Sequence, residues 1–168
     1  MEAWYAVWTR SHCERLVADQ LTAKGFASFL PEIHRRPRRT SPARTLVPTP
    51  MFPGYLFVRD AMDKTRYIEM LKVRGIVRVL EDGWTRLTPI DDGDIEAIRK
   101  VMEADVTVLP HPYLRHGERV RVVEGPLSGV EGIFVHDRQQ KGRLVLSVDL
   151  LGRSVSVEVD DMAVAPCA

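Results

Sequence analysis

Residues 51–58, which read MFPGYLFV, constrain the fold of this chain more than any other stretch. The Phe-Pro-Gly part predicts a tight turn, and the aromatic and aliphatic residues after it predict a strand. Successive side chains of a strand point to opposite faces, so Leu56 and Val58 should share one face and can fill a core. Tyr55 and Phe57 share the other face, where they either anchor a partner helix or belong to a second buried layer.

The N-terminal part of the chain predicts a strand, a helix and a second strand. Residues 3–10 alternate enough to indicate a strand that is rich in aromatic and small apolar residues. Ser11 and Glu14 have the spacing of a capping box, which predicts the start of a helix. Residues 26–33 predict the second strand, with Pro31 at a sheet edge or a bulge.

Residues 35–50 contain four prolines and predict a loop, because proline breaks both helices and strand ladders. After the aromatic strand, the apolar spacing predicts a helix at residues 63–72 and a strand at 76–80. Pro89 and the acidic residues after it predict a third helix, since both suit a helix N-terminus. This order is typical of an α+β domain with a ferredoxin-like antiparallel sheet and packed helices, which we place at residues 1–105.

The pattern changes in the C-terminal third of the chain. Residues 106–115 contain two prolines and no clear period, so we interpret them as a linker. Residues 116–168 alternate valine with polar side chains, and glycines interrupt them at turn spacing. Several short strands with glycine-rich turns in so short a segment predict a small β-barrel.

Charge is unevenly distributed although the net charge is only +1. Residues 35–80 contain eleven Lys or Arg and three Asp or Glu, whereas residues 81–105 contain three basic and eight acidic residues. Such a basic segment predicts contact with a polyanion, and the alternative is a solvated loop beside an acidic helix. The candidate nucleic-acid-binding residues are Arg35, Arg36, Arg38, Arg39 and Arg44.

The sequence contains no recognisable catalytic or metal-binding motif. The five histidines are scattered, and neither C-x-x-C nor H-E-x-x-H occurs, so we expect no enzymatic activity, metal or cofactor. Cys13 and Cys167 lie near opposite ends, and we expect no disulfide between them in a reducing compartment. The chain has no apolar run of membrane-spanning length and no signal-peptide pattern at its N-terminus, so we expect a cytoplasmic protein.

Three stretches together resemble the NusG family of transcription elongation factors. They are residues 4–7 (WYAV), residues 52–58 (FPGYLFV) and the glycine-rich residues 117–132. The first domain resembles the family's N-terminal domain, and residues 116–168 resemble its SH3-like KOW barrel. Residues 143–155 look most like the specialised antiterminator paralogues, the RfaH-like and UpxY-like branch.

The resemblance implies a protein that binds RNA polymerase through its N-terminal domain, on the coiled-coil clamp helices of the largest subunit. It also implies suppression of pausing or termination, and a place for the arginine-rich loop near upstream or non-template DNA. The positions that match the family's polymerase-binding depression are Trp8, Phe52, Pro53, Tyr55 and Phe57.

The KOW domain of the family recruits partners through an apolar loop. The implied partners are a small-subunit ribosomal protein and, for general members, the termination factor Rho. Leu151 stands where general members often carry an aromatic residue, which argues against Rho. The alternative is a ribosome-associated or RNA-binding KOW protein, against which the net charge of +1 argues. In its main role we expect the protein to be a monomer that does not bind a membrane. The matching positions are Leu150, Leu151, Gly152 and Arg153.

Overall fold

The computed structural model describes residues 1–35, 47–80 and 84–167. The chain divides into two compact units, Met1–Asp92 (unit 1) and Gly93–Ala168 (unit 2). Across the described residues, no helix has the length and apolar character needed to cross a membrane.

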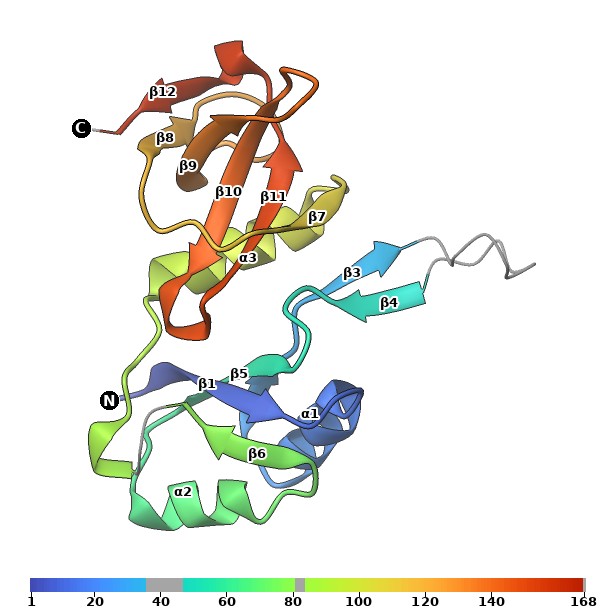
Figure 1. The fold of residues 1–168 in the computed structure, drawn as a ribbon. Helices are drawn as coiled ribbons and strands as arrows, with labels where there is room; N and C mark the ends of the chain where they lie inside the picture. The colour runs from blue at the N-terminus through green and yellow to red at the C-terminus, as the bar shows by residue number, and fades with distance from the viewer. Residues whose placement is uncertain (36–46, 81–83, 168) are drawn as a thin grey trace. The chain divides into compact units, whose positions relative to one another are not determined.

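Unit 1 contains a four-stranded antiparallel sheet with the strand order β2-β5-β1-β6 (Figure 1). This order confirms the predicted ferredoxin-like sheet, because each of the two helices joins two strands that have another strand between them in the sheet. The strands are β1 (Ala3–Thr9), β2 (Ala27–Phe29), β5 (Tyr55–Asp60) and β6 (Ile76–Val79), and the helices are α1 (Glu14–Ala23) and α2 (Lys64–Leu71).

One face of this sheet forms the core of unit 1 together with the two helices. Leu56 and Val58 of β5 are fully buried there, as their alternation predicted. They pack in one cluster with Val17 and Leu21 of α1 and with Met70 of α2. Burial of aliphatic side chains contributes roughly 1.5–3 kcal/mol each, so this cluster stabilises the unit.

The boundaries of α1 and α2 show one correct and one wrong capping prediction. The predicted helix at 63–72 is confirmed, since Asp63 caps α2 by accepting a hydrogen bond from the Arg66 backbone N–H at 2.8 Å. The predicted capping box of Ser11 and Glu14 is wrong. Cys13, not Ser11, is the N-cap residue of α1 and makes no side-chain capping bond. The Glu14 carboxylate accepts from the Gly54 N–H instead of closing a capping box.

The strand predicted at residues 26–33 is divided at Pro31. Its first part is β2, while the rest is β3 (Glu32–Arg35), which pairs with β4 (Val47–Pro50) in a separate two-stranded ribbon (Figure 1). Proline lacks an N–H, but the Pro31 carbonyl accepts a hydrogen bond from the Met51 N–H at 2.7 Å, which closes the base of the ribbon. The prediction of an unbroken loop over residues 35–50 is therefore wrong at both of its ends.

The third helix, α3 (Asp92–Glu103), follows the short 3-10 turn η1 (Trp84–Arg86), as the acidic residues after Pro89 predicted. Ile95, Ile98 and Val101 are its buried side chains. All but the first residue of α3 belong to unit 2, whereas the predicted first domain extends to residue 105. Sequence pattern identifies an amphipathic helix but does not identify the surface that covers its apolar face.

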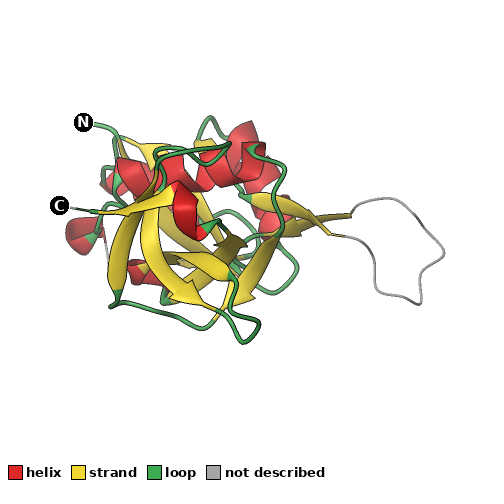
Figure 2. Ribbon diagram, turned by 90° about the horizontal axis from the view of Figure 1, so that it is seen from above, coloured by secondary structure: helices red, strands yellow, loops and turns green. Residues whose placement is uncertain are grey.

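Unit 2 contains a six-stranded antiparallel sheet of barrel type with the order β12-β8-β9-β10-β11-β7 (Figure 1). Figure 2 shows strongly curved strands in yellow. The predicted barrel is confirmed. Close packing requires glycine at position 132, since a Cβ there would lie 2.6 Å from the Val145 carbonyl oxygen. The strands are β7 (Val108–His111), β8 (Glu118–Val122), β9 (Glu131–His136), β10 (Gly142–Val148), β11 (Arg153–Glu158) and β12 (Val164–Pro166), with 3-10 turns η2 (Asp149–Leu151) and η3 (Asp161–Ala163).

The segment that we interpreted as a linker, residues 106–115, contains strand β7. Val108 is buried and lies opposite Val157 of β11. This pairing joins residues far apart in the sequence. Pro110 and Pro112 interrupt the local sequence pattern, so the strand cannot be recognised from neighbouring residues. A two-proline segment next to a glycine-rich domain is typical of a linker, so only the tertiary contacts identify it as a strand.

Candidate functional site

The Phe-Pro-Gly turn lies beside the indole ring of Trp8. Trp8 of β1 is the register partner of Tyr55 at the start of β5. Gly54 adopts a φ of +87°, a left-handed conformation that favours glycine, and a Cβ there would lie 3.8 Å from the Trp8 ring. Trp8 is 38% exposed, Pro53 is exposed and Tyr55 is half-buried, so these three side chains reach the surface.

The backbone of Gly54 is held from two sides. Its N–H donates to Oε1 of Glu14 at 2.9 Å, and its carbonyl accepts from the Thr9 N–H at 2.8 Å. Glu14 is only 7% exposed, so its carboxylate is largely withdrawn from water. Hydrogen bonds to charged acceptors are stronger than neutral ones. The turn is therefore fixed between α1 and the end of β1.

A hollow of about 360 Å³ opens beside this turn. Trp8 and two prolines give it apolar walls, while Glu14 and hydroxyl groups supply polar ones. The guanidinium of Arg78 lies 5.5 Å from the centre of the Trp8 ring, which places a positive charge near the apolar wall. Such a hollow can receive an amphipathic side chain from a partner surface. It is lined by Trp8, Thr9, Ser11, His12, Glu14, Thr49, Pro50, Pro53 and Gly54.

Phe52 and Phe57, also predicted at this site, are buried rather than presented at the surface. The ring of Phe57 stacks on Phe29 at 6.3 Å between centroids and meets the edge of Phe52 at 6.4 Å. Trp4 extends the row by an edge contact with Phe29 at 6.1 Å. The aromatic face of β5 thus divides into a buried row, which supports the turn, and the surface group of Trp8, Pro53 and Tyr55.

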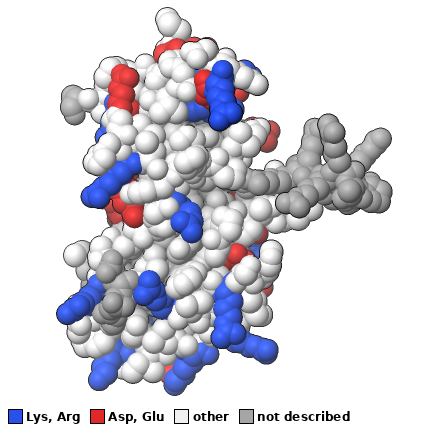
Figure 3. All heavy atoms as spheres, viewed as in Figure 1, with Lys and Arg blue, Asp and Glu red and all other residues white. Residues whose placement is uncertain are grey.

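Four of the five predicted nucleic-acid-binding residues, Arg36, Arg38, Arg39 and Arg44, lie outside the described residues. Arg35 is the last residue of β3. Unit 1 as a whole has 15 Lys or Arg and 11 Asp or Glu. On the face of unit 1 that Figure 3 shows, basic side chains outnumber acidic ones.

The predicted partner-binding residues form the tip of the β10–β11 hairpin in unit 2. We call Leu150, Leu151, Gly152 and Arg153 the hairpin tip. Leu151 is buried, Leu150 is half-buried and Arg153 is exposed. Gly152 has a φ of +59°, which lets the chain reverse after η2. Leu150 and Arg153 are therefore the tip side chains that reach the surface.

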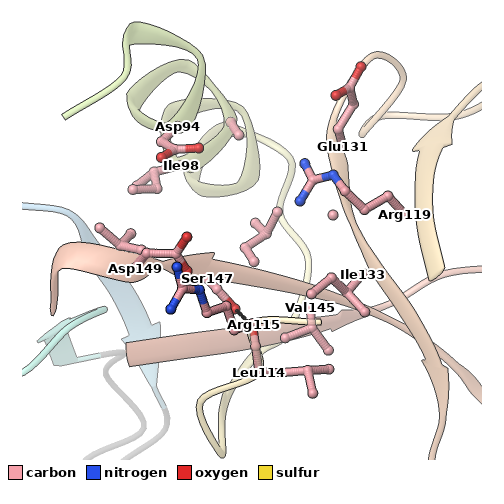
Figure 4. Close-up of a pocket in the computed structure, with 14 residues that line it drawn as sticks. Asp94, Ile98, Leu114, Arg115, Arg119, Glu131, Ile133, Val145, Ser147 and Asp149 are labelled. Atoms are coloured by element: carbon pink, nitrogen blue, oxygen red, sulfur yellow. Dashed lines mark hydrogen bonds between the residues drawn. The ribbon is translucent and has the colours of Figure 1, made fainter. Parts of the chain in front are cut away.

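Unit 2 also contains a cavity of about 110 Å³ between α3 and the barrel sheet, which no sequence pattern indicated. Figure 4 shows Asp94 and Ile98 of α3 across the cavity from Ile133 and Val145 of the sheet. Its acidic and basic groups come from separate segments, so spacing along the chain could not reveal them. Within the described residues, no cluster of three or more His, Cys, Asp or Glu could hold a metal ion.

Glu14 is the main site residue that sequence analysis assigned to the wrong role. Its spacing from Ser11 suits a capping box, and nothing local connects it with Gly54. The two residues are 40 positions apart, so only the packing of α1 against the turn brings them together.

The family model described as "Transcription termination factor nusG" matches residues 2–99. The chain is 29% identical over 110 residues to the transcription termination/antitermination protein NusG of Escherichia coli strain K12, and 26% identical over 109 residues to that of Helicobacter pylori. Each match covers 65% of this chain and 61% of the relative, so the chain spans about three fifths of these relatives.

A solved structure described as "Domain interaction in Thermotoga maritima NusG" has a similar fold. Its TM-score is 0.59 and its sequence identity 20%, and the match covers 100% of this chain and 98% of the other. The fold similarity extends over both units, whereas the family model matches mainly unit 1. None of these matches separates the specialised branch, which stays a prediction. The family match covers more than half of the chain, and we conclude that this protein belongs to the NusG family.

Proposed function

We propose that this protein is a transcription elongation and antitermination factor that binds RNA polymerase through unit 1. Its role is to bind and bridge rather than to catalyse a reaction. The observation that supports the proposal most is the hollow beside Trp8 and Pro53, which is built on a rigid turn. The occupant that we propose is the clamp-helix coiled coil of the largest polymerase subunit.

The physical argument rests on a preorganised aromatic anchor. Trp8 is already partly exposed, and Gly54 is held by Glu14 and Thr9, so little ordering is needed on binding. Aromatic residues that fill a partner's surface pocket are typical binding hot spots, and truncating one costs about 2 kcal/mol or more. A helical surface offers side chains at i, i+3 and i+4, which suits a short apolar hollow.

Two further contacts belong to the proposal. The arginine-rich segment at residues 35–44 contacts upstream or non-template DNA, because five arginines in ten residues attract phosphates. The hairpin tip recruits a second protein, for which we propose a small-subunit ribosomal protein, with Leu150 and Arg153 as its surface contacts.

The test compares two exposed tryptophans of unit 1. Trp8→Ala removes the proposed anchor, whereas Trp84→Ala removes a 44% exposed tryptophan that does not line the hollow. We expect Trp8→Ala to weaken binding to RNA polymerase by about 30-fold, which corresponds to about 2 kcal/mol, and Trp84→Ala to change it less than about 2-fold. Equal affinities of the two variants would overturn the proposed site. Capture of ribosomes but not polymerase by the parent would favour the ribosome-associated alternative.

A further inference from the structure

Strand β7 differs from the other strands of the six-stranded sheet in how the chain connects it. Strands β8, β9, β10 and β11 are neighbours both in sequence and in the sheet, and β12 returns to pair with β8. By contrast, β7 precedes β8 in sequence but pairs with β11, at the other side of the sheet. It therefore covers the backbone edge of β11 that the barrel itself leaves open.

Of the four β7 side chains, Val108 alone is buried on this edge. Val108 is buried opposite Val157, whereas Leu109 is 41% exposed and Pro110 is also exposed. Pro110 has no N–H, so the four residues of β7 bring at most three backbone donors. Residues 154–157 of β11 are all buried. The edge of β11 is thus a well-formed strand site, while its present occupant has four residues and a single buried side chain.

The residues after β7 continue along the β10–β11 hairpin. The Leu114 N–H donates to Oγ of Ser154 at 3.2 Å, and the Leu114 carbonyl accepts from Oγ of Ser147 at 2.5 Å. The Tyr113 hydroxyl donates to Oδ1 of Asp149 at 2.8 Å, and both side chains are exposed. Asp149 immediately precedes the hairpin tip, so this segment ends where the second partner is proposed to bind.

We propose that β7 is a displaceable strap, and that an extended segment of a partner protein pairs with the edge of β11 in its place. Strand addition draws its affinity from main-chain hydrogen bonds and its selectivity from alternate side-chain pockets. The fitting segment runs antiparallel to β11, places a β-branched residue opposite Val157 and brings a hydroxyl donor to Asp149. This proposal deepens the recruiting role proposed for the hairpin tip and rests on it for the kind of partner.

The first test is amide hydrogen exchange of the full chain. If β7 opens while the barrel stays folded, β11 amides that bond to β7 exchange through local opening. We expect them to exchange at least about tenfold faster than β11 amides that bond to β10. Equal protection of the two sets at every denaturant concentration would overturn the strap, because β7 would then open only with the whole sheet.

The second test supplies the strand from outside. The variant replaces residues 108–111 by Gly-Ser-Gly-Ser in the full chain, and the probe is a synthetic peptide with the sequence of residues 106–115. We expect micromolar binding to the variant and at least tenfold weaker binding to the parent, with a scrambled peptide as the control. A variant that loses the barrel fold, or one that stays folded without binding, would each show that β7 is not displaceable.

A matched pair of tyrosine variants tests whether the hydrogen bond from Tyr113 to Asp149 helps to hold β7 in place. Tyr113→Phe removes the hydroxyl donor and should accelerate exchange of the β7-bonded amides several-fold. Tyr67→Phe makes the same chemical change in α2 of unit 1 and should leave these amides unaffected. Unchanged exchange in Tyr113→Phe would show that the hydrogen bond to Asp149 does not hold β7 in place. None of these measurements contains polymerase or ribosomal protein, so their outcome is independent of whether the proposed function holds.

Discussion

The backbone N–H of Gly54 donates a 2.9 Å hydrogen bond to Oε1 of Glu14, across 40 positions of sequence. This bond links the first turn of α1 to the Phe-Pro-Gly turn beside Trp8. A half-buried N–H that loses its acceptor is costly, so the carboxylate stabilises the turn in which Gly54 has its left-handed conformation. The hollow that we propose as the polymerase site therefore depends on Glu14 both for the support of the turn and for part of its polar lining.

Replacing Glu14 by Ala should destabilise unit 1 by about 1–3 kcal/mol, because the Gly54 N–H is left without its acceptor. Glu14→Gln keeps an acceptor oxygen and should cost less. All three tryptophans lie in unit 1, so the urea dependence of tryptophan fluorescence follows this unit alone. Asp19→Ala, an exposed acidic residue of the same helix, is the control and should change stability by less than about 0.5 kcal/mol.

Phe57 should behave as a core residue in unfolding experiments. Its ring is fully buried against Phe29 and Phe52, and removal of a buried aromatic ring typically costs about 3–5 kcal/mol. We expect Phe57→Ala to shift the fluorescence-detected urea midpoint far more than Tyr55→Ala, since Tyr55 is half-buried. A midpoint for Phe57→Ala equal to the parent's would show that the ring supports no core.

The arginine-rich segment should contribute affinity for nucleic acid that depends on salt but not on sequence. Each phosphate contact adds about 0.9 to the slope of log K against log salt for duplex DNA. Replacement of Arg36, Arg38 and Arg39 by Ala should therefore flatten this slope by up to about 2.7 in an elongation-complex scaffold. The triple Lys variant keeps the charge and should keep most of the slope. An unchanged slope in the Ala variant would show that the arginine-rich segment makes no phosphate contacts.

Asp137 in the β9–β10 turn should titrate at unusually low pH. The Lys141 N–H, the Gln139 N–H and the Arg143 side chain bond to its carboxylate and hold the pKa of Asp137 below its usual value. A lowered pKa stabilises the folded state above the unfolded pKa of about 3.9, and this contribution is lost as pH falls through the folded value. Carboxyl carbon NMR titration should show the low midpoint, and Asp137→Asn should reduce the acid sensitivity of unit 2.

Local sequence predicted the elements whose signals agree with one another. The helix at 63–72 and the third helix have clear apolar spacing and acidic starts. The barrel follows from alternating valines and from glycines, since a glycine in a helix interior costs about 1 kcal/mol and a proline about 3. The aromatic strand at β5 was likewise evident, and its alternation correctly assigned Leu56 and Val58 to the core.

The sequence by itself determined the helices and strands with strong local signals, the barrel and the family motifs, because each of these is encoded in neighbouring residues. Tertiary structure decided the rest. It assigned Glu14 to Gly54 instead of to Ser11, divided a strand at Pro31, buried Phe57 and turned a proline-rich linker into β7. Each of these outcomes depends on a contact between residues far apart in the chain, and local propensity carries no information about which distant group will arrive.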